Sequence, residues 1–599
     1  MFDRADYADK CMQRANVLEW LPFLPGQTIV VANSVPGAVL QMLKDKGLQL
    51  QLMSETHIEK LAKNPGKGNL DYVLLMGMEV DAQMVAGLSR KLNAKGRLIM
   101  LVHNRYGMSY LAGVPSGEET YFGSVLGKNA RKTAFYSKNG IDKLLKAAEI
   151  AEYQIFYPDP DGAFTTNIYS DAYLPKAGEC YGRPRNFTYD RLSLFSDKEA
   201  FDEAVTEGMY PVFANDFLVV TGEPLPQILV RYSNDRSESY QLKTEIYEEA
   251  GTRLVRKVAL KQEGAEHLSA MEQAYTLLTK QYDEEAFSFV PCVREEQAIC
   301  FPFVKGRALS ELMEEALQAG DMETVFSWFH SFLRRLENGR RMEFSNYDFI
   351  FSNIIIDGDK WQVIDYEWTL PQFVPATELA FRAAYCFSLE HPDFPFADIC
   401  KVLNLSEENV KRLMSRETAY QQKITGSMPS TDSLCAAHGG TVVDLHTMLR
   451  AVELSPGDSA AQIYIDSGKG FSEEKSYFVK HAMKNHCEME LLLEIPAGVK
   501  NLRVDPCEEP CLVLIKKIWW NQEEQQLDKQ IVINGTKGKG GKLGYGEYVF
   551  ATNDPNITIP VEKLSQSDAS SNQCRILLEV HKISLQMANS LTKSIKRII

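Results

Sequence analysis

The stretch 346–368 places the strongest constraint on the fold, because it combines two short apolar runs with polar side chains at their ends. Asp348 stands five residues before Asn353, three isoleucines follow, and the chain reverses at an Asp-Gly turn within 357–360. A second apolar run then ends at Asp365. β-Branched runs joined by an Asp-Gly turn are typical of a hairpin. The sequence therefore predicts a loop, a strand, a turn and a strand, with carboxylates at both ends.

This layout has a purpose in kinase-type phosphoryl transfer. There, one Asp accepts the proton of the attacking hydroxyl, an Asn five residues later holds a metal ion, and an Asp after the hairpin holds the metal that bridges the phosphates. Asp348, Asn353 and Asp365 occupy these three places. The alternative is ordinary hairpin chemistry, since Asp-Gly turns flanked by acids are common.

The same run resembles the catalytic and metal-binding loops of the aminoglycoside and choline kinase group, which are small-molecule relatives of protein kinases. The resemblance implies a bilobal kinase-like fold that uses ATP and Mg²⁺. The chain departs from the group at Asn346 and Tyr347, where the group has His followed by Gly or Arg. That histidine has a structural rather than a chemical role, so the departure concerns how the loop is held.

The residues before this run predict the small lobe of such a kinase. Three antiparallel strands are expected within 226–260, and Lys257 lies on the third. Lys257 is the candidate for contacting the α- and β-phosphates, because its positive charge offsets phosphate charge. Glu272, on the helix predicted from 265 to 281, is the acid expected to pair with it, and Glu266 on the same helix is the alternative. The other interpretation of Lys257 is a solvated lysine at the edge of the sheet.

Further residues extend the kinase hypothesis. The segment 299–306 is apolar and ends at a glycine, which predicts a hinge whose backbone bonds an adenine ring. Glu367 is a candidate second carboxylate beside the metal, and Glu378 stands where such kinases keep an acid that braces the catalytic loop. Carboxylates this close need a cation, because like charges raise one another's pKa. The alternative is that they are surface acids, which an acidic chain has in plenty.

Strands and helices alternate over the first part of the chain, which predicts a parallel sheet covered by helices. Several stretches there resemble class I S-adenosylmethionine-dependent methyltransferases attached to cell-surface polysaccharide synthesis. The stretches are LEW at 18–20, DYVLLMG at 71–77, and most specifically HNRYG at 103–107 with YLAG at 110–113. The resemblance implies a Rossmann-like methyltransferase fold.

The cofactor turn of this first part is unusual. S-adenosylmethionine sites need a glycine-rich turn after the first strand, so that the cofactor can lie close to the backbone. Residues 32–38 read ANSVPGA, with a single glycine, and Val35 and Pro36 bring side chains toward the space of the cofactor. The segment between Glu55 and Asp71 is too short for a full third strand–helix unit. We therefore expect a degenerate fold that does not bind S-adenosylmethionine. An active methyltransferase is the alternative.

Together the two folds resemble the bifunctional enzymes that phosphorylate and then methylate the growing end of O-antigen polymannose. For this chain the resemblance implies a phosphotransferase whose acceptor is a saccharide or a glycan end in cell-envelope synthesis. Glycosyltransferases of the same pathway are the implied partners. The alternative is a non-catalytic scaffold that assembles those glycosyltransferases.

The last part of the chain predicts an all-β module. Short apolar runs separated by turn residues are typical of a β-sandwich. The sequences at 462–474 and 502–506 resemble modules appended to bacterial rhamnan and lipopolysaccharide glycosyltransferases. The tail from 583 mixes lysines and arginine with apolar residues, so it is a candidate for peripheral contact with the inner face of a membrane or for pairing with another helix.

Length and composition set the wider limits. At 599 residues the chain is too long for one core. A net charge of −15 argues against a nucleic-acid partner, which would require a basic surface. Eleven cysteines without CxxC pairs indicate neither a zinc site nor a disulfide framework. With no signal-peptide pattern and no apolar run of about 20 residues, a cytoplasmic protein is expected.

The sequence thus predicts a multidomain chain of α/β, α+β and all-β parts. The expected domains are a methyltransferase-like domain at 1–225, a kinase-like domain at 226–430, a β-sandwich at 431–582 and a short basic helical tail at 583–599.

Overall fold

The chain is a multidomain protein of mixed α/β structure with large sheets and many helices, as the sequence predicts. The computed structural model describes residues 12–114, 125, 135–179, 191–193, 195, 197–426, 442–444, 459–481, 487–525, 530–538, 546–564 and 571–598. The chain divides into two compact units. Unit 1 comprises Met1–Leu111, Gly123–Phe187 and Lys198–His438, and unit 2 comprises Ala112–Phe122, Thr188–Asp197 and Gly439–Ile599. The boundary predicted at 430–431 lies outside the described residues.

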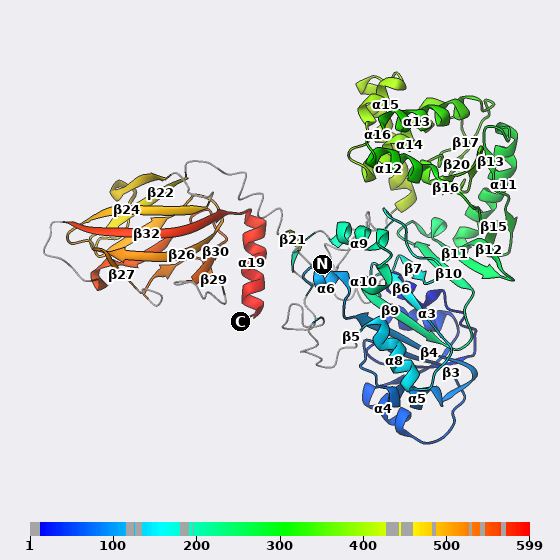
Figure 1. The fold of residues 1–599 in the computed structure, drawn as a ribbon, viewed down its shortest axis with the longest axis horizontal. Coiled ribbons are helices and arrows are strands. Elements are labelled where there is room, and N and C mark those ends of the chain that lie inside the picture. Colours follow the sequence, from blue (N-terminus) through cyan, green and yellow to red (C-terminus); the bar gives the residue numbers. More distant parts are fainter. Residues whose placement is uncertain are drawn as a thin grey trace. The chain divides into compact units, whose positions relative to one another are not determined.

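One large sheet runs through unit 1 (Figure 1). Among the described residues it has 13 strands, in the order β14-β15-β12-β11-β10-β7-β6-β9-β4-β3-β1-β2, with β5 paired to β4. Its strands are β1 (Thr28–Ala32), β2 (Gln49–Met53), β3 (Leu70–Met76), β4 (Leu92–Asn104), β5 (Phe135–Tyr136), β6 (Tyr153–Asp159), β7 (Asn167–Ser170), β9 (Asp216–Thr221), β10 (Gln227–Ser233), β11 (Leu242–Glu249), β12 (Thr252–Ala259), β14 (Val293–Arg294) and β15 (Ala298–Pro302). Strands β2, β1, β3 and β4 are parallel, and the path from β4 to β14 is antiparallel.

The parallel part follows from its apolar strands. β1 reads TIVVA and its last four residues are buried, which is typical of a parallel strand covered on both faces. The accompanying helices are α3 (Gly37–Asp45), α4 (Glu55–Lys63), α5 (Ala82–Ser89) and α8 (Lys138–Ala147). Between β2 and β3 the described chain forms α4 and no further strand, so β2 is an edge strand. This confirms that the segment is too short for a complete additional unit.

The sheet continues across the boundary predicted at 225–226. Strand β10 pairs with β7 on one side and with β11 on the other. Side chains join the same regions, because Glu19 of the LEW motif pairs with Lys243 at 3.0 Å and accepts a hydrogen bond from the Tyr232 hydroxyl at 3.0 Å. The first two predicted domains therefore share one sheet and lie together in unit 1.

The remainder of unit 1 is mostly helical. Its helices are α11 (Ala265–Gln281), α12 (Leu309–Gln318), α13 (Met322–Glu337), α14 (Ala376–Glu390), α15 (Phe396–Val402) and α16 (Glu407–Thr425). A small sheet in the order β13-β19-β18-β16 accompanies them, with the strands β13 (Ser288–Phe289), β16 (Arg307–Ala308), β18 (Ile354–Asp357) and β19 (Lys360–Val363). Helix α13 buries Val325, Phe329, Phe332 and Leu336 at helical spacing, which places one apolar face in the core.

Unit 2 contains two antiparallel sheets that share one core. One sheet has the order β23-β22-β25-β31-β28 and the other β24-β32-β26-β30-β29, with β27 paired to β26. Their strands are β22 (Ser459–Asp466), β23 (Ser476–His481), β24 (Glu488–Pro496), β25 (Asn501–Asp505), β26 (Cys511–Trp520), β27 (Glu523–Glu524), β28 (Val532–Ile533), β29 (Thr536–Lys537), β30 (Gly546–Phe550), β31 (Ile557–Pro560) and β32 (Ser571–Lys582). Burial alternates along β24 and β32, so each sheet turns one face to the common core.

The tail forms α19 (Leu585–Ile598), drawn in red beside β29 and β30 (Figure 1). Ala588 of α19 is fully buried in a cluster with Val549 and Ile583, and Leu591 and Ile595 pack partly against that cluster. Part of its apolar face is therefore used within unit 2. No helix in the described part of the chain is long and apolar enough to span a lipid bilayer.

Candidate functional site

The predicted loop and hairpin form as expected and bring Asp348 and Asn353 into contact. β17 (Ser345–Asn346) leads into the loop, a short 3₁₀ turn covers Phe351–Asn353, and β18 and β19 pair as an antiparallel hairpin. Asn353 Nδ2 donates to the backbone oxygen of Asp348 at 3.1 Å and to its Oδ2 at 3.0 Å. The amide side chain therefore fixes the orientation of the carboxylate.

Lys257 reaches this region from β12. Its Nζ lies 2.6 Å from Asp365 Oδ2 and 3.0 Å from Glu367 Oε2, and the residue is only 7% exposed. Lys257 is thus a buried, paired cation and not a solvated edge lysine. The side chains of Asp348 and Asp365 retain 13% and 24% exposure, so both remain accessible to a ligand.

Asn346 links the two pairs of residues. It is fully buried, its Oδ1 accepts from the Asp348 backbone N–H at 2.9 Å, and its Nδ2 donates to the Asp365 backbone oxygen at 3.4 Å. This residue stands where the resembling kinases have histidine. In this chain it holds the loop and the end of the hairpin together, which is a structural role.

Glu272 does not pair with Lys257, so this expected partner is wrong. Glu272 is exposed on α11, and Lys257 pairs with Asp365 and Glu367 instead. On the same helix His267 faces the site, with Nε2 2.9 Å from Glu367 Oε1. Five residues turn an α-helix by about 500°, which places Glu272 on a different side of α11 from His267.

Glu367, expected as a second carboxylate beside the metal, contacts three side chains. Its Oε1 contacts Arg236 at 2.5 Å and His267 at 2.9 Å, and its Oε2 contacts Lys257. With both oxygens engaged by cationic or N–H groups and only 8% exposure, Glu367 is a partner for Lys257. Trp368 packs beside it, with its ring 4.8 Å from that of His267.

Arg382 on α14 braces the loop that carries Asp348, a contact that was not expected from the sequence. Its Nη1 donates to the Tyr347 backbone oxygen at 2.6 Å and lies 3.3 Å from Asp348 Oδ1. Its Nε pairs with Glu417 Oε2 at 2.8 Å, and Arg382 is 5% exposed. Glu378, the acid expected in this role, pairs instead with arginines of α16. The sequence held one indication that Arg382 could brace this loop. It stands one helical turn after Glu378 and therefore lies on the same side of α14.

The pKa values of Asp348, Lys257 and Glu367 are shifted in different directions. Burial raises the pKa of Asp348 to about 6, the charge of Asp365 acts in the same direction, and Arg382 opposes it. Burial disfavours the charged form of Lys257, but Asp365 and Glu367 outweigh this and raise its pKa above the usual value. Burial also tends to raise the pKa of Glu367, yet Lys257 and Arg236 lower it well below its usual range. Asp348 is therefore the carboxylate poised for proton transfer near neutral pH.

The segment predicted as a hinge lies close to the backbone of the hairpin at Gly306. Gly306 has φ +133°, and a Cβ added there would lie 2.5 Å from the Ile356 backbone oxygen. Only glycine meets both conditions without strain. β16, which follows Gly306, pairs with β18, so the segment predicted as a hinge is directly connected to the hairpin at 354–363.

The turn expected to replace a cofactor loop lies between β1 and α3. Val35 is buried in the hydrophobic core and Pro36 is the N-cap of α3. The HNRYG stretch follows the same sheet at the end of β4. There Asn104 donates to the backbone oxygen of Ala214 at 2.7 Å, and His103 Nδ1 lies 2.6 Å from Asp216 Oδ1. These motif residues tie β4 to the segment that begins β9.

The site therefore gathers four of the five expected residues, Asp348, Asn353, Asp365 and Lys257, and adds Asn346, Glu367 and Arg382. It offers an accessible carboxylate base, oxygen donors suited to a hard cation and a buried ammonium group within one region. Comparison with protein-family models and with curated proteins gives no match for this chain.

Proposed function

We propose that the chain is an ATP- and Mg²⁺-dependent phosphotransferase that transfers the γ-phosphate to a hydroxyl of a saccharide or glycan end in cell-envelope synthesis. The observation that carries the proposal is the meeting of two pairs at one hairpin: Lys257 with Asp365 at 2.6 Å, and Asn353 with Asp348 at 3.0 Å. Asn346 joins the two pairs through contacts of 2.9 and 3.4 Å. Phosphoryl transfer needs a base, a metal site and a cation for the phosphates in this proximity.

The oxygen ligands at this site fit Mg²⁺, the metal ion that the proposed reaction requires. The Asp365 carboxylate and the Asn353 amide oxygen are hard oxygen ligands, which Mg²⁺ prefers. When bound there, Mg²⁺ would neutralise charge on the phosphate oxygens. Lys257 supplies a second positive charge, and Arg382 and Asn346 hold Asp348 and Asp365 in place.

In the proposed step, Asp348 accepts the proton of the acceptor hydroxyl. The hydroxyl oxygen forms a bond to the γ-phosphorus as the bond from that phosphorus to the β–γ bridging oxygen breaks, and ADP leaves with that oxygen. Asp348 then returns its proton to solvent. The partial exposure of Asp348 permits both the approach of the acceptor and the loss of the proton.

The proposal also includes the fold of each part of the chain. We assign a Rossmann-like methyltransferase fold to the part of unit 1 before residue 226, a bilobal kinase-like fold to the part of unit 1 from residue 226 onward, and a β-sandwich to unit 2. Supporting features are the parallel strands followed by antiparallel β9, and the antiparallel strands with α11 placed before the catalytic hairpin. We propose no S-adenosylmethionine chemistry, because Val35, in the turn after β1, is part of the hydrophobic core.

Calorimetry of the full chain with ATP and Mg²⁺ tests nucleotide binding. We expect heat of binding for the wild type, none for Asp365→Ala, and wild-type behaviour for Asp359→Ala, since Asp359 lies exposed in the hairpin turn. Asp348→Asn should bind nucleotide but fail to label a glycan from γ-labelled ATP. Absence of heat for the wild type would overturn the proposal and favour the scaffold.

A further inference from the structure

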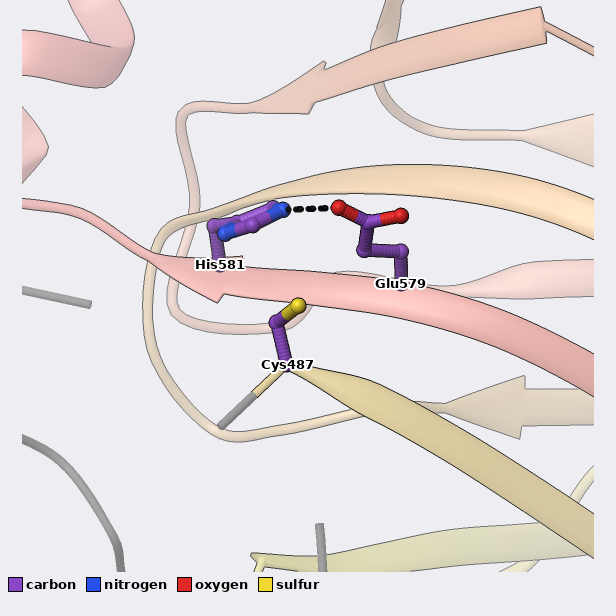
Figure 2. Close-up of side chains that lie close together, drawn as sticks. All are labelled: Cys487, Glu579 and His581. Carbon is purple, nitrogen blue, oxygen red and sulfur yellow. Dashed lines mark hydrogen bonds and ion pairs between the residues drawn. The ribbon is translucent and has the colours of Figure 1, made fainter. Parts of the chain in front are cut away.

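Three side chains with metal-binding donors meet in unit 2 at the junction of β24 and β32 (Figure 2). Cys487 immediately precedes β24, and Glu579 and His581 lie near the end of β32. One donor atom of each residue lies within 4.8 Å of the other two. Figure 2 shows the His581 ring joined to the Glu579 carboxylate, with the Cys487 sulfur on the neighbouring strand. Cys487 is far from Glu579 and His581 in the sequence, so spacing gave no zinc signature.

We propose that Cys487, Glu579 and His581 bind one Zn²⁺, with water as the fourth ligand. Sulfur, imidazole nitrogen and carboxylate oxygen are the ligands that zinc takes, at about 2.0–2.3 Å. In a tetrahedral zinc site with these bond lengths, the donor atoms lie about 3.5 Å apart. Modest rotation of the side chains would bring the three donor atoms to that distance. A thiolate in the set favours zinc over Mg²⁺ or Ca²⁺, which select oxygen ligands.

The backbone that carries the donors is fixed by the β-ladder. The Val580 N–H donates to the Cys487 oxygen at 2.8 Å, and the next residue pair is Glu488 with Glu579. His581 Nε2 already lies 3.0 Å from Glu579 Oε1. A metal ion would therefore be bound by side chains on a preformed strand pair, without rearrangement of either strand.

A cation bound at the cluster would take the Cys487 sulfur as a thiolate and would compete with one ammonium group. Binding breaks the S–H bond, forms the Zn–S bond and releases that proton to solvent. Lys516 competes for the site, because its Nζ lies 2.9 Å from Glu579 Oε2. Glu488, 3.5 Å from the same ammonium, offers it an alternative partner.

Cobalt and zinc titrations of the chelator-treated full chain test the site. We expect one equivalent of Co²⁺ to give a thiolate-to-metal charge-transfer band and one equivalent of Zn²⁺ to abolish it. Cys487→Ser and His581→Gln should lose the band and weaken Zn²⁺ binding more than about 100-fold. Cys300→Ser and His330→Gln, which lie outside the cluster, are the matched controls. Lys516→Met should bind Zn²⁺ more tightly, because it removes the competing ammonium.

Either of two results would overturn the zinc site. One is a wild type without the thiolate band, and the other is a band that survives in both Cys487→Ser and His581→Gln. Circular dichroism of each variant confirms that the loss of metal does not come from unfolding. The cluster belongs to unit 2, so its failure leaves the phosphotransferase proposal unaffected, and the reverse also holds.

Discussion

Replacing Arg382 with methionine should destabilise unit 1 strongly, because it leaves a buried carboxylate without its cation. Glu417 is 6% exposed and receives two hydrogen bonds from Arg382, at 2.8 and 3.3 Å. Removing one member of a buried ion pair costs about 3–5 kcal/mol. At about 2 cal/mol/K of unfolding entropy per residue over roughly 400 residues, this lowers the thermal midpoint of unit 1 by about 4–6 °C.

The assay is thermal unfolding of the full chain, with the first transition compared between variants. Arg412→Met is the matched control, because Arg412 also pairs with a glutamate but its side chain is 56% exposed. Exposed pairs contribute less than about 1 kcal/mol, so the control should shift the midpoint by about 1 °C or less.

A double variant separates the charge from the packing. Arg382→Met combined with Glu417→Leu removes both charges, and it should recover at least half of the lost stability. Tyr347 and Asp348 still lose their donor in the double variant, so recovery is incomplete. Equal loss in Arg382→Met and Arg412→Met, or a double variant less stable than the single one, would refute the buried-pair argument.

Two other substitutions test separate features of unit 1. Gly306→Ala should destabilise by about 1–3 kcal/mol, because its φ of +133° disfavours a side chain and the new Cβ meets the Ile356 oxygen; Gly320→Ala, with φ +70° and open space, should cost less in the same melting assay. Burial lowers the pKa of His103, but the charge of Asp216 outweighs burial and raises that pKa above 6.5. Asp216→Asn should therefore bring the pKa of His103 below 6.5 in an NMR titration of labelled histidines. An unchanged titration of His103 would contradict this.

Elements with strong local signals were predictable from the sequence. The helix expected at 265–281 is α11 with the same bounds, and the strand expected before the turn at 32–38 is β1. Both depend on patterns within a few residues: apolar periodicity in one case and a β-branched run in the other. The Asp-Gly hairpin at 354–363 is local in the same way, which is why its formation followed from the sequence.

The partners of Lys257 and Asp348 were not predictable, because they depend on which elements meet in space. Glu272 was chosen by separation along the chain, but the facing side of α11 presents His267. Arg382 acts through contacts with a loop more than thirty residues earlier and a helix more than thirty residues later. No local pattern encodes such contacts.

The arrangement around Lys257 bears directly on how the proposed reaction would begin. Asp365 has one oxygen against Lys257 at 2.6 Å and the other accepting the Glu367 N–H at 3.1 Å, so a cation bound by Asp365 would compete with the ammonium group for the carboxylate oxygens. A buried ammonium left without a partner would cost several kcal/mol. Glu367 removes that penalty, because it stays 3.0 Å from Lys257 and is itself held by Arg236. The same acid would keep Lys257 charged and in place if Asp365 turned to a cation, so the lysine that we propose as the phosphate contact needs no acid from α11.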